Sequence, residues 1–266
     1  MTARLDAELA ARGLARSRTH AAGLIADGLV RVDGIAVVKP SHRVDADSRI
    51  DVAGVDHYVS RAAHKLIAAL DAFAVEVAGR PALDMGASTG GFTQVLRERG
   101  ADPVVALDVG HGQLAEVVAA DAGVIAVEGF NVRYMTPETL AEVVGRAYRP
   151  AVITGDLSFI SLGHVLPAVR AVVEEATDVV LLVKPQFEVG RTAVRGGLVT
   201  DAALRADAVS QVLWQAWDLG LGTRGLIASP IVGTHGNSEY IVRLGLRGGS
   251  IPTEWESTVI DLTGAR

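Results

Sequence analysis

The chain has 266 residues, of which 49% are hydrophobic and 21% charged, and its formal net charge is -6. This composition is typical of a globular protein, and the length fits one large domain or a large domain with a small module. The sequence contains no cysteine, which excludes disulfides, thiolate nucleophiles and cysteine-based zinc or iron–sulfur sites. Its apolar runs, such as 179–183, are far shorter than the roughly 20 residues of a membrane-spanning helix, and no secretory signal is visible. We therefore expect a cytoplasmic protein.

Residues 1–43 differ in charge from the rest of the chain. They contain seven lysines and arginines against four aspartates and glutamates, a net charge of +3, so the remainder carries -9. A basic segment on an acidic body indicates contact with a polyanion such as nucleic acid. Arginines on an ordinary solvated surface give the same count, so the charge alone leaves both possibilities open.

The first 60 residues predict a small domain. Apolar spacing indicates two short helices, the second capped by Ser17 and ending near Gly28. A hairpin follows, in which 29–32 and 35–38 flank Asp33-Gly34, a dipeptide that tolerates the positive φ of a two-residue turn. This order of elements resembles the small RNA-binding domain named after the fourth protein of the small ribosomal subunit. The resemblance implies that basic side chains bind RNA phosphates, here Arg4, Arg16, Arg18 and Lys39.

The pattern then changes to alternating strands and helices. Unbroken apolar runs, typical of strands buried on both faces of a parallel sheet, predict strands at 82–84, 104–108, 124–127, 151–154 and 179–183. Helices are expected around 64–73, 92–100, 113–121, 137–147, 162–175 and 202–219. A last strand is expected around 238–244. The alternation predicts a doubly wound α/β sheet.

A glycine-rich turn at 83–93 follows the first of these strands, where an open α/β sheet binds a nucleotide. The turn is not Gly-x-Gly-x-x-Gly, so a pyrophosphate-binding dehydrogenase fits less well. Asp108 ends the next strand, where a carboxylate accepts hydrogen bonds from ribose hydroxyls in both nicotinamide and S-adenosylmethionine enzymes. Asp84 adds a carboxylate beside the turn, which suits a ligand that carries ammonium and sulfonium charges.

Charged residues stand at the ends of later strands. Asp156 and Lys184 each follow an apolar strand, and the carboxyl ends of parallel strands meet at one rim of the sheet. Pro185 stops regular pairing directly after Lys184. Glu239 begins the last strand and joins the same rim only if that strand runs antiparallel, which is assumed here.

Four separated words carry a resemblance to a known family: SRAAHKL at 60–66, GASTGGFT at 86–93, DLSFISL at 156–162 and VKPQFEVG at 183–190. With the N-terminal module they resemble the TlyA family of bacterial ribosomal RNA cytidine 2′-O-methyltransferases, whose catalytic domain is of the FtsJ type. The resemblance implies a Rossmann-like class I methyltransferase sheet, parallel with one antiparallel strand, preceded by a small α+β RNA-binding domain. We expect the RNA-binding domain at 1–58, a linker at 59–64 and the methyltransferase domain at 65–266.

The resemblance also implies roles for individual residues. The family's Lys-Asp-Lys-Glu tetrad maps onto Lys65, Asp156, Lys184 and Glu239, with Lys184 as the preferred base and Lys65 positioning the ribose and phosphate. The residues expected to bind S-adenosylmethionine are Asp84, Gly86, Ser88, Thr89, Gly90, Gly91, Phe92, Asp108, Val109, Asn131 and Phe159. Arg133 is expected to contact RNA. The expected partner is ribosomal RNA or a ribosomal subunit, and we expect a monomer without a metal, because the seven histidines show no ligand spacing.

The tetrad suits methylation of a ribose. The 2′-hydroxyl is a weak acid, so a base must take its proton as it attacks the methyl group. A lysine, with a solution pKa of about 10.4, can do so only if a neighbouring cation or burial lowers its pKa, whereas nearby carboxylates raise it. The net direction is open from sequence alone.

Three other functions account for the sequence less completely. A nicotinamide dehydrogenase explains Asp108 and the glycine turn but not the tetrad. A non-catalytic RNA-binding factor for ribosome assembly would keep the same domains without turnover. A haemolysin-like membrane activity, suggested by the label that TlyA relatives carry, finds no spanning or basic amphipathic segment.

Overall fold

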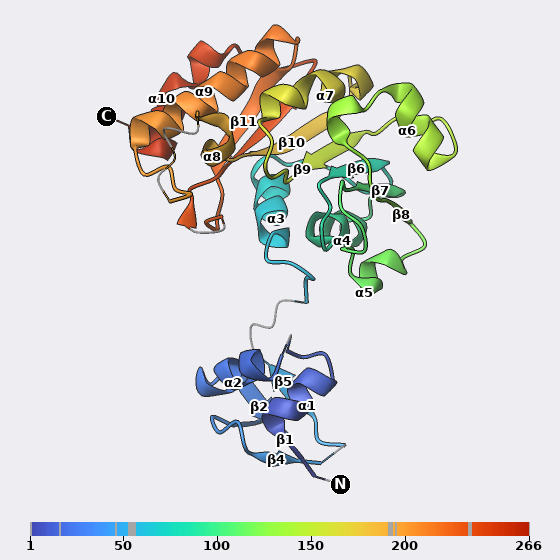
Figure 1. The fold of residues 1–266 in the computed structure, drawn as a ribbon, viewed down its shortest axis with the longest axis vertical. Helices are drawn as coiled ribbons and strands as arrows, with labels where there is room; N and C mark the ends of the chain where they lie inside the picture. The colour runs from blue at the N-terminus through green and yellow to red at the C-terminus, as the bar shows by residue number, and fades with distance from the viewer. Residues whose placement is uncertain are drawn as a thin grey trace. The chain divides into compact units, whose positions relative to one another are not determined.

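The computed structural model describes residues 2–15, 17–45, 47–52, 57–190, 194, 196–233 and 236–265. The chain divides into two compact units, Met1–His57 and Tyr58–Arg266, which are described separately (Figure 1). Residues 59–64, which were expected to form a linker, are grouped with the larger unit. Their packing explains the difference, since a Cβ on Gly91 would lie 2.8 Å from the Cβ of Ser60.

The smaller unit packs two helices, α1 (Leu5–Ala11) and α2 (Arg18–Ala26), with short strands. A three-stranded antiparallel sheet has the order β3 (Ile35–Ala36), β2 (Val30–Val32), β5 (Ile50–Val52), and β1 (Ala3–Arg4) pairs with β4 (Arg43–Val44). The Ser17 hydroxyl accepts a hydrogen bond from the backbone N–H of His20 at 3.2 Å, which confirms the predicted cap. Asp33 and Gly34 both have positive φ, 49° and 82°, as the predicted two-residue turn requires.

The larger unit is built on a seven-stranded sheet with the order β11-β12-β10-β9-β6-β7-β8. The bounds are β6 Ala82–Met85, β7 Val104–Leu107, β8 Val124–Val127, β9 Val152–Gly155, β10 Asp178–Val183, β11 Gly222–Ala228 and β12 Tyr240–Gly245. β12 runs antiparallel to both of its neighbours, and the other pairs are parallel. The assumed antiparallel last strand is thus confirmed. β11 was not predicted, because its two glycines and Arg224 interrupt the apolar run by which the other strands were found.

Helices cover both faces of this sheet (Figure 1). They are α3 Ala63–Ala72, α4 Gly91–Glu98, α5 Glu116–Ala119, α6 Pro137–Val144, α7 Leu166–Val172, α8 Pro185–Glu188, α9 Ala202–Asp218 and α10 Glu256–Thr263, with short 3-10 turns η1 Val132–Tyr134, η2 Leu162–His164 and η5 Pro252–Trp255. α3 and α4 pack on one face, whereas α7, α9 and α10 pack on the other. Within β10, Val179, Leu181 and Val183 pack in the core on the side of α7, α9 and α10. Val180 and Leu182 pack in the core on the side of α3 and α4. This double burial explains the unbroken apolar run of β10.

Two features are absent from the described ranges. No helix there is long and apolar enough to cross a membrane. No group of three or more His, Asp or Glu side chains in those ranges is placed to hold a metal ion.

Candidate active site

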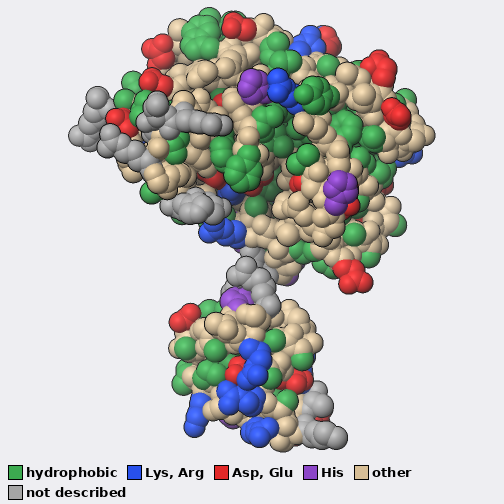
Figure 2. Space-filling view, in the orientation of Figure 1, with side chains coloured by type: hydrophobic (Ala, Val, Ile, Leu, Met, Phe, Trp, Pro, Cys, Tyr) green, Lys and Arg blue, Asp and Glu red, His purple; other side chains and the backbone are tan. Residues whose placement is uncertain are grey.

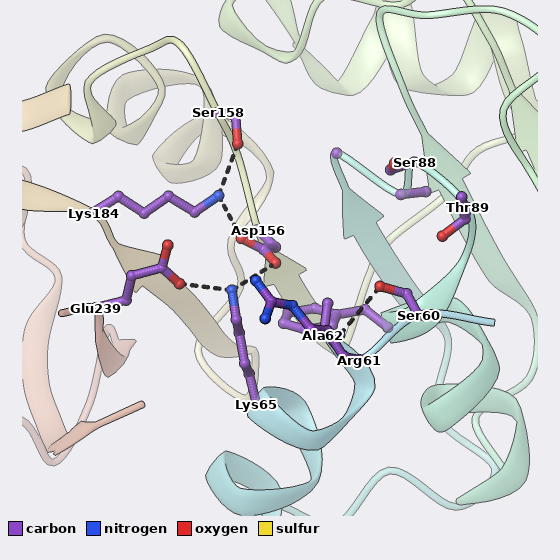
Figure 3. A pocket seen from close by; sticks show the side chains of 14 residues that line it. Ser60, Arg61, Ala62, Lys65, Ser88, Thr89, Asp156, Ser158, Lys184 and Glu239 are labelled. Atoms are coloured by element: carbon purple, nitrogen blue, oxygen red, sulfur yellow. Dashed lines mark hydrogen bonds and ion pairs between the residues drawn. The ribbon is translucent and has the colours of Figure 1, made fainter. Parts of the chain in front are cut away.

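Four charged side chains from separate elements meet at one end of the sheet (Figure 3). Lys65 lies in the first turns of α3, Asp156 directly follows β9, Lys184 directly follows β10, and Glu239 directly precedes β12. Val183 pairs with Tyr240 across β10 and β12, so the antiparallel register puts Lys184 and Glu239 next to each other. We call these four residues the tetrad. The fold therefore brings together all four residues of the predicted Lys-Asp-Lys-Glu set.

The two lysines of the tetrad have different partners. The Lys65 amine donates hydrogen bonds to Glu239 Oε2 at 2.6 Å and to Asp156 Oδ2 at 3.4 Å. The Lys184 amine forms an ion pair with Asp156 Oδ1 at 2.7 Å, without the alignment of a hydrogen bond. It donates a hydrogen bond to the hydroxyl of Ser158 at 2.8 Å. Asp156 thus uses one carboxylate oxygen for each lysine.

Three side chains of the tetrad are almost completely removed from solvent, and that of Asp156 is 15% exposed. The exposed fractions are 6% for Lys65, 7% for Lys184 and 4% for Glu239. Burying charges costs several kcal/mol each unless partners compensate, and here two ammonium groups face two carboxylates. Gly233 makes room for this arrangement, since a Cβ there would lie 2.0 Å from Glu239 Oε1. The chain contains only three lysines, Lys39, Lys65 and Lys184, against 22 arginines. Two of the three lysines therefore belong to the tetrad.

The tetrad lines a pocket of about 230 Å³ that also contains the glycine-rich turn. A second pocket of about 550 Å³ shares Gly86, Ser88, Asp156 and Ser158 with the first, so the two pockets adjoin each other. Its other lining residues combine polar and apolar side chains: Leu107, Asp108, Val109, Gln113, Phe130, Asn131, Val132, Leu157, Phe159 and Ile160. The pair of pockets therefore offers room for an elongated ligand with one end beside the tetrad.

Most residues predicted to bind the cofactor line one of these pockets. Ser88, Thr89, Gly91 and Phe92 line the tetrad pocket, and Asp108, Val109, Asn131 and Phe159 line the larger one. Gly86 belongs to both, with a φ of +77° and a Cβ position 3.0 Å from Leu157 Cδ2. The Asp108 carboxylate accepts hydrogen bonds from the backbone N–H groups of Ser88 at 2.8 Å and Gly110 at 2.7 Å. The turn and the end of β7 are thereby fixed to each other.

Asp84 and Gly90 lie behind the turn and line neither pocket. Asp84 is 1% exposed, and its two oxygens accept hydrogen bonds from the hydroxyls of Thr93 at 2.7 Å and Thr154 at 3.0 Å. Burial raises the pKa of Asp84 to about 6, and the two threonine hydroxyls partly oppose this shift. Gly90 has a φ of +95° and caps α4. Asp84 was expected beside the ligand, whereas in the structure its side chain points into the protein and connects β6 to α4 and β9.

The loop that carries Asp156 and Ser158 is held at its far end by Glu188. Glu188 Oε2 accepts a hydrogen bond from the Ser161 hydroxyl at 2.6 Å, and Oε1 accepts one from the backbone N–H of Leu162 at 2.9 Å. Burial raises the pKa of Glu188. Phe159, in the middle of the loop, has a φ of +65° and is 92% exposed, with its ring centroid 5.4 Å from that of Phe187.

The predicted RNA-binding residues fall on both units. On the smaller unit, Arg4 and Arg18 lie 2.9 and 3.3 Å from Asp6 Oδ2, and their side chains are 44% and 62% exposed. The hydrogen bond from Arg4 is the main reason that the pKa of Asp6 falls to about 2. Lys39 is exposed, and Figure 2 shows Lys and Arg side chains gathered on this unit. Arg133 is exposed on the larger unit, 5.8 Å from the centre of the Tyr134 ring. Arg16 lies outside the described residues.

Sequence reasoning missed three polar residues of the tetrad pocket: Ser60, Arg61 and Ser158. All three lie inside the words that carried the family resemblance, within five residues of Lys65 or Asp156. Their proximity to the tetrad was the available signal. Which of them contacts a charged group depends on side-chain placement, and only the structure gives the Ser158–Lys184 contact.

Comparison with known proteins identifies relatives along nearly the whole chain. A model of FtsJ-like methyltransferases matches residues 58–246, and a model of S4 domains matches 3–50. The 16S/23S rRNA (cytidine-2′-O)-methyltransferase TlyA of Mycobacterium tuberculosis is 50% identical over 91% of this chain and 89% of its own. Hemolysin A of Brachyspira hyodysenteriae is 36% identical over 90% of this chain and 98% of its own. A solved structure of a candidate hemolysin from Streptococcus thermophilus aligns with a TM-score of 0.73 and 34% identity, covering 99% of this chain and 96% of its own.

Proposed function

Because this chain belongs to the FtsJ-like methyltransferase family, we propose that it transfers a methyl group from S-adenosylmethionine to the 2′-hydroxyl of a cytidine ribose in ribosomal RNA. The observation that carries the proposal is the tetrad, in which two lysines and two carboxylates meet in a pocket that adjoins a larger one. The substrate is that of the Mycobacterium tuberculosis relative, which is 50% identical.

The chemistry of the pockets supports S-adenosylmethionine as the methyl donor. When bound, this cofactor supplies an electrophilic methyl group on a sulfonium and leaves as a neutral thioether. Asp108 lies where it can accept hydrogen bonds from the ribose hydroxyls, and Leu157 and Ile160 offer apolar contact to an adenine. Residues 86–89 line the tetrad pocket, and they would hold the amino-acid end. The residues present therefore fit the cofactor.

We assign the proton transfer to Lys184. In its neutral form it takes the proton of the 2′-hydroxyl and becomes an ammonium, so the ribose oxygen can bond to the methyl group. The partners of the two lysines support this assignment, because Lys65 lies between two carboxylates whereas Lys184 faces one carboxylate and a neutral hydroxyl. Lys65 then remains the cation that holds the ribose and its phosphate.

The burial of the tetrad favours an enzyme over a non-catalytic RNA-binding factor. Replacing a buried ion pair by apolar residues is often neutral or stabilising. A chain selected only to fold and bind RNA has no need to retain two lysines less than 10% exposed inside its larger unit. The matched carboxylates make the cost tolerable, and catalysis gives a reason for it.

We assign RNA recognition to the N-terminal unit, whose S4-type sequence and exposed basic side chains support the role. Arg4, Arg18 and Lys39 would contact phosphates there, and so would Arg16, which lies outside the described residues. Arg133 adds a basic side chain on the larger unit. Phosphate contacts position an RNA without reading its sequence, so this unit supplies affinity and orientation.

The direct experiment is methyl transfer in vitro. Purified protein is incubated with S-adenosylmethionine labelled in its methyl group and with ribosomal subunits from cells that lack the protein. The RNA is then digested to nucleosides and separated. We expect label in 2′-O-methylcytidine, and mapping of the methylated riboses then identifies the position.

The matched control is Lys184→Arg, which keeps the positive charge but cannot give up its proton at neutral pH. It should bind cofactor and RNA yet transfer no methyl group. Absence of transfer to any ribosomal RNA by the wild-type protein, under conditions in which it binds the cofactor, would refute the proposed function. Label on a base instead of a ribose would contradict the assignment of the 2′-hydroxyl.

A further inference from the structure

The hydroxyl of Ser158 is the one group in the described part of the chain that receives a hydrogen bond from the Lys184 amine. Lys65 differs, because both of its hydrogen bonds go to carboxylates. Hydrogen bonds are strongly directional, whereas an ion pair depends mainly on distance. The direction of the Lys184 amine is therefore set by a neutral hydroxyl, and its charge is balanced by Asp156.

We propose that Ser158 is a positioning residue that aims the lone pair of neutral Lys184 into the tetrad pocket, an inference that rests on the proposed function. A neutral lysine amine has two N–H bonds and one lone pair in a tetrahedral arrangement. One N–H stays on Ser158, and the second is drawn toward the Asp156 carboxylate 2.7 Å away. The lone pair then takes the remaining direction, toward the pocket that Lys184 lines.

The backbone around Ser158 is held firmly enough for this role. On one side, Leu157 packs so close to Gly86 that a Cβ on that glycine would lie 3.0 Å away. On the other side, Glu188 holds Ser161 and Leu162 through two hydrogen bonds. Phe159, next to Ser158, adopts a φ of +65°, a conformation that a bulky residue keeps only where its surroundings impose it. Ser158 itself lines both pockets, at their junction.

Removing the hydroxyl leaves Lys184 its charge partner but not its direction. The amine can then turn, and the lone pair points to the pocket for only part of the time. Misplacement of a reacting group costs up to about 100-fold in rate, so we expect Ser158→Ala to lower kcat about 10- to 100-fold. The KM for RNA and the Kd for S-adenosylmethionine should stay within about twofold, because Lys184 is not needed to bind either. Ser158→Thr keeps the hydroxyl and should recover most of kcat.

A second readout observes the lysine directly. Since the chain has only three lysines, protein labelled with ¹³C and ¹⁵N at lysine gives three side-chain Cε–Nζ signals by NMR. Ser158→Ala should shift the Lys184 signal and leave that of Lys65 in place, and Ser158→Thr should restore it. The matched control is Ser161→Ala, which removes a hydroxyl from the same loop that is bonded to Glu188 instead of a lysine. Glu188 keeps its second hydrogen bond, to the backbone N–H of Leu162, so the loop remains held in this variant. It should leave the Lys184 signal unmoved.

The outcomes separate this proposal from the proposed function. If wild-type protein shows no methyl transfer, the proposed function fails, and the role of Ser158 fails with it. If the wild type is active and Ser158→Ala keeps its kcat, only the role of Ser158 is overturned. A Ser158→Ala enzyme that loses kcat together with cofactor binding and melting temperature, without recovery in Ser158→Thr, overturns it in favour of a general structural role.

Discussion

The two units hold their charged side chains in opposite ways. In the tetrad, Lys65 and Lys184 are less than 10% exposed and each touches a carboxylate. In the N-terminal unit, the side chains of Arg4 and Arg18 are 44% and 62% exposed and share the single carboxylate of Asp6. Moving a proton at one atom requires amines fixed in place and shielded from water. Holding a polyanion requires surplus charge that the polyanion can reach. The difference is consistent with catalysis in the larger unit and with binding of a polyanion by the N-terminal unit.

The largest effect is expected at Lys184. Lys184→Ala removes the proposed base and should lower single-turnover methyl transfer by about 1,000-fold, within the range that general-base catalysis contributes. The Kd for S-adenosylmethionine, measured by calorimetry, should change less than about twofold. If Lys184→Arg restores transfer, the lysine acts only as a cation and the base must be sought elsewhere.

A smaller loss is expected from Gly233→Ala, which changes no charged residue. The added Cβ would lie 2.0 Å from Glu239 Oε1 and must push this carboxylate away from Lys65. We expect kcat to fall about 10- to 100-fold, as for other small displacements in an active site. Gly190→Ala is the control, because nothing lies within 4 Å of a Cβ there. Equal rates for the two variants would contradict a fixed tetrad.

In the N-terminal unit, Arg18→Glu should weaken RNA binding about tenfold without changing single-turnover transfer at saturating RNA. Asp6 keeps Arg4 as its partner in this variant. The slope of log affinity against log salt concentration should decrease in magnitude by about one, because one phosphate contact and its counterion release are lost. Arg49→Glu, at an arginine 80% exposed on the same unit, is the control. An Arg18→Glu protein with wild-type affinity would remove this surface from the RNA interface.

The smallest effect on activity is expected at Asp84, whose influence is on stability. Its pKa rises from the ordinary 3.8 to about 6 in the folded chain, so the folded state binds a proton more tightly than the unfolded state. The free energy of unfolding should therefore fall as pH rises from about 4 to above 6, by up to about 3 kcal/mol. Asp84→Asn should lack this decline. Urea unfolding at pH 5 and pH 7.5 measures the change in the free energy of unfolding between the two pH values. An equal change in wild type and variant would contradict a buried, titrating Asp84.

Sequence patterns predicted most of the larger unit, because strands buried on both faces leave unbroken apolar runs and parallel strands place their ends together. They missed β11, which lies at the sheet edge and contains two glycines, α8, a single turn after Lys184, and α10 near the end of the chain. The tetrad was inferred from a family resemblance and from the rule for strand ends. Two features of the site could not be predicted in this way: the contact of Lys184 with Ser158 and the inward position of Asp84. Both depend on side-chain packing, which no spacing rule encodes.

Asp156 is shared by both amines, with Oδ2 on Lys65 and Oδ1 on Lys184. The two amines therefore depend on a single carboxylate, and a change in its charge or position affects both of them at once. Substitutions at either lysine will therefore not combine additively with a change at Asp156. Asp156 couples the two amines electrostatically, so its replacement by asparagine should remove this coupling even though both amines remain present.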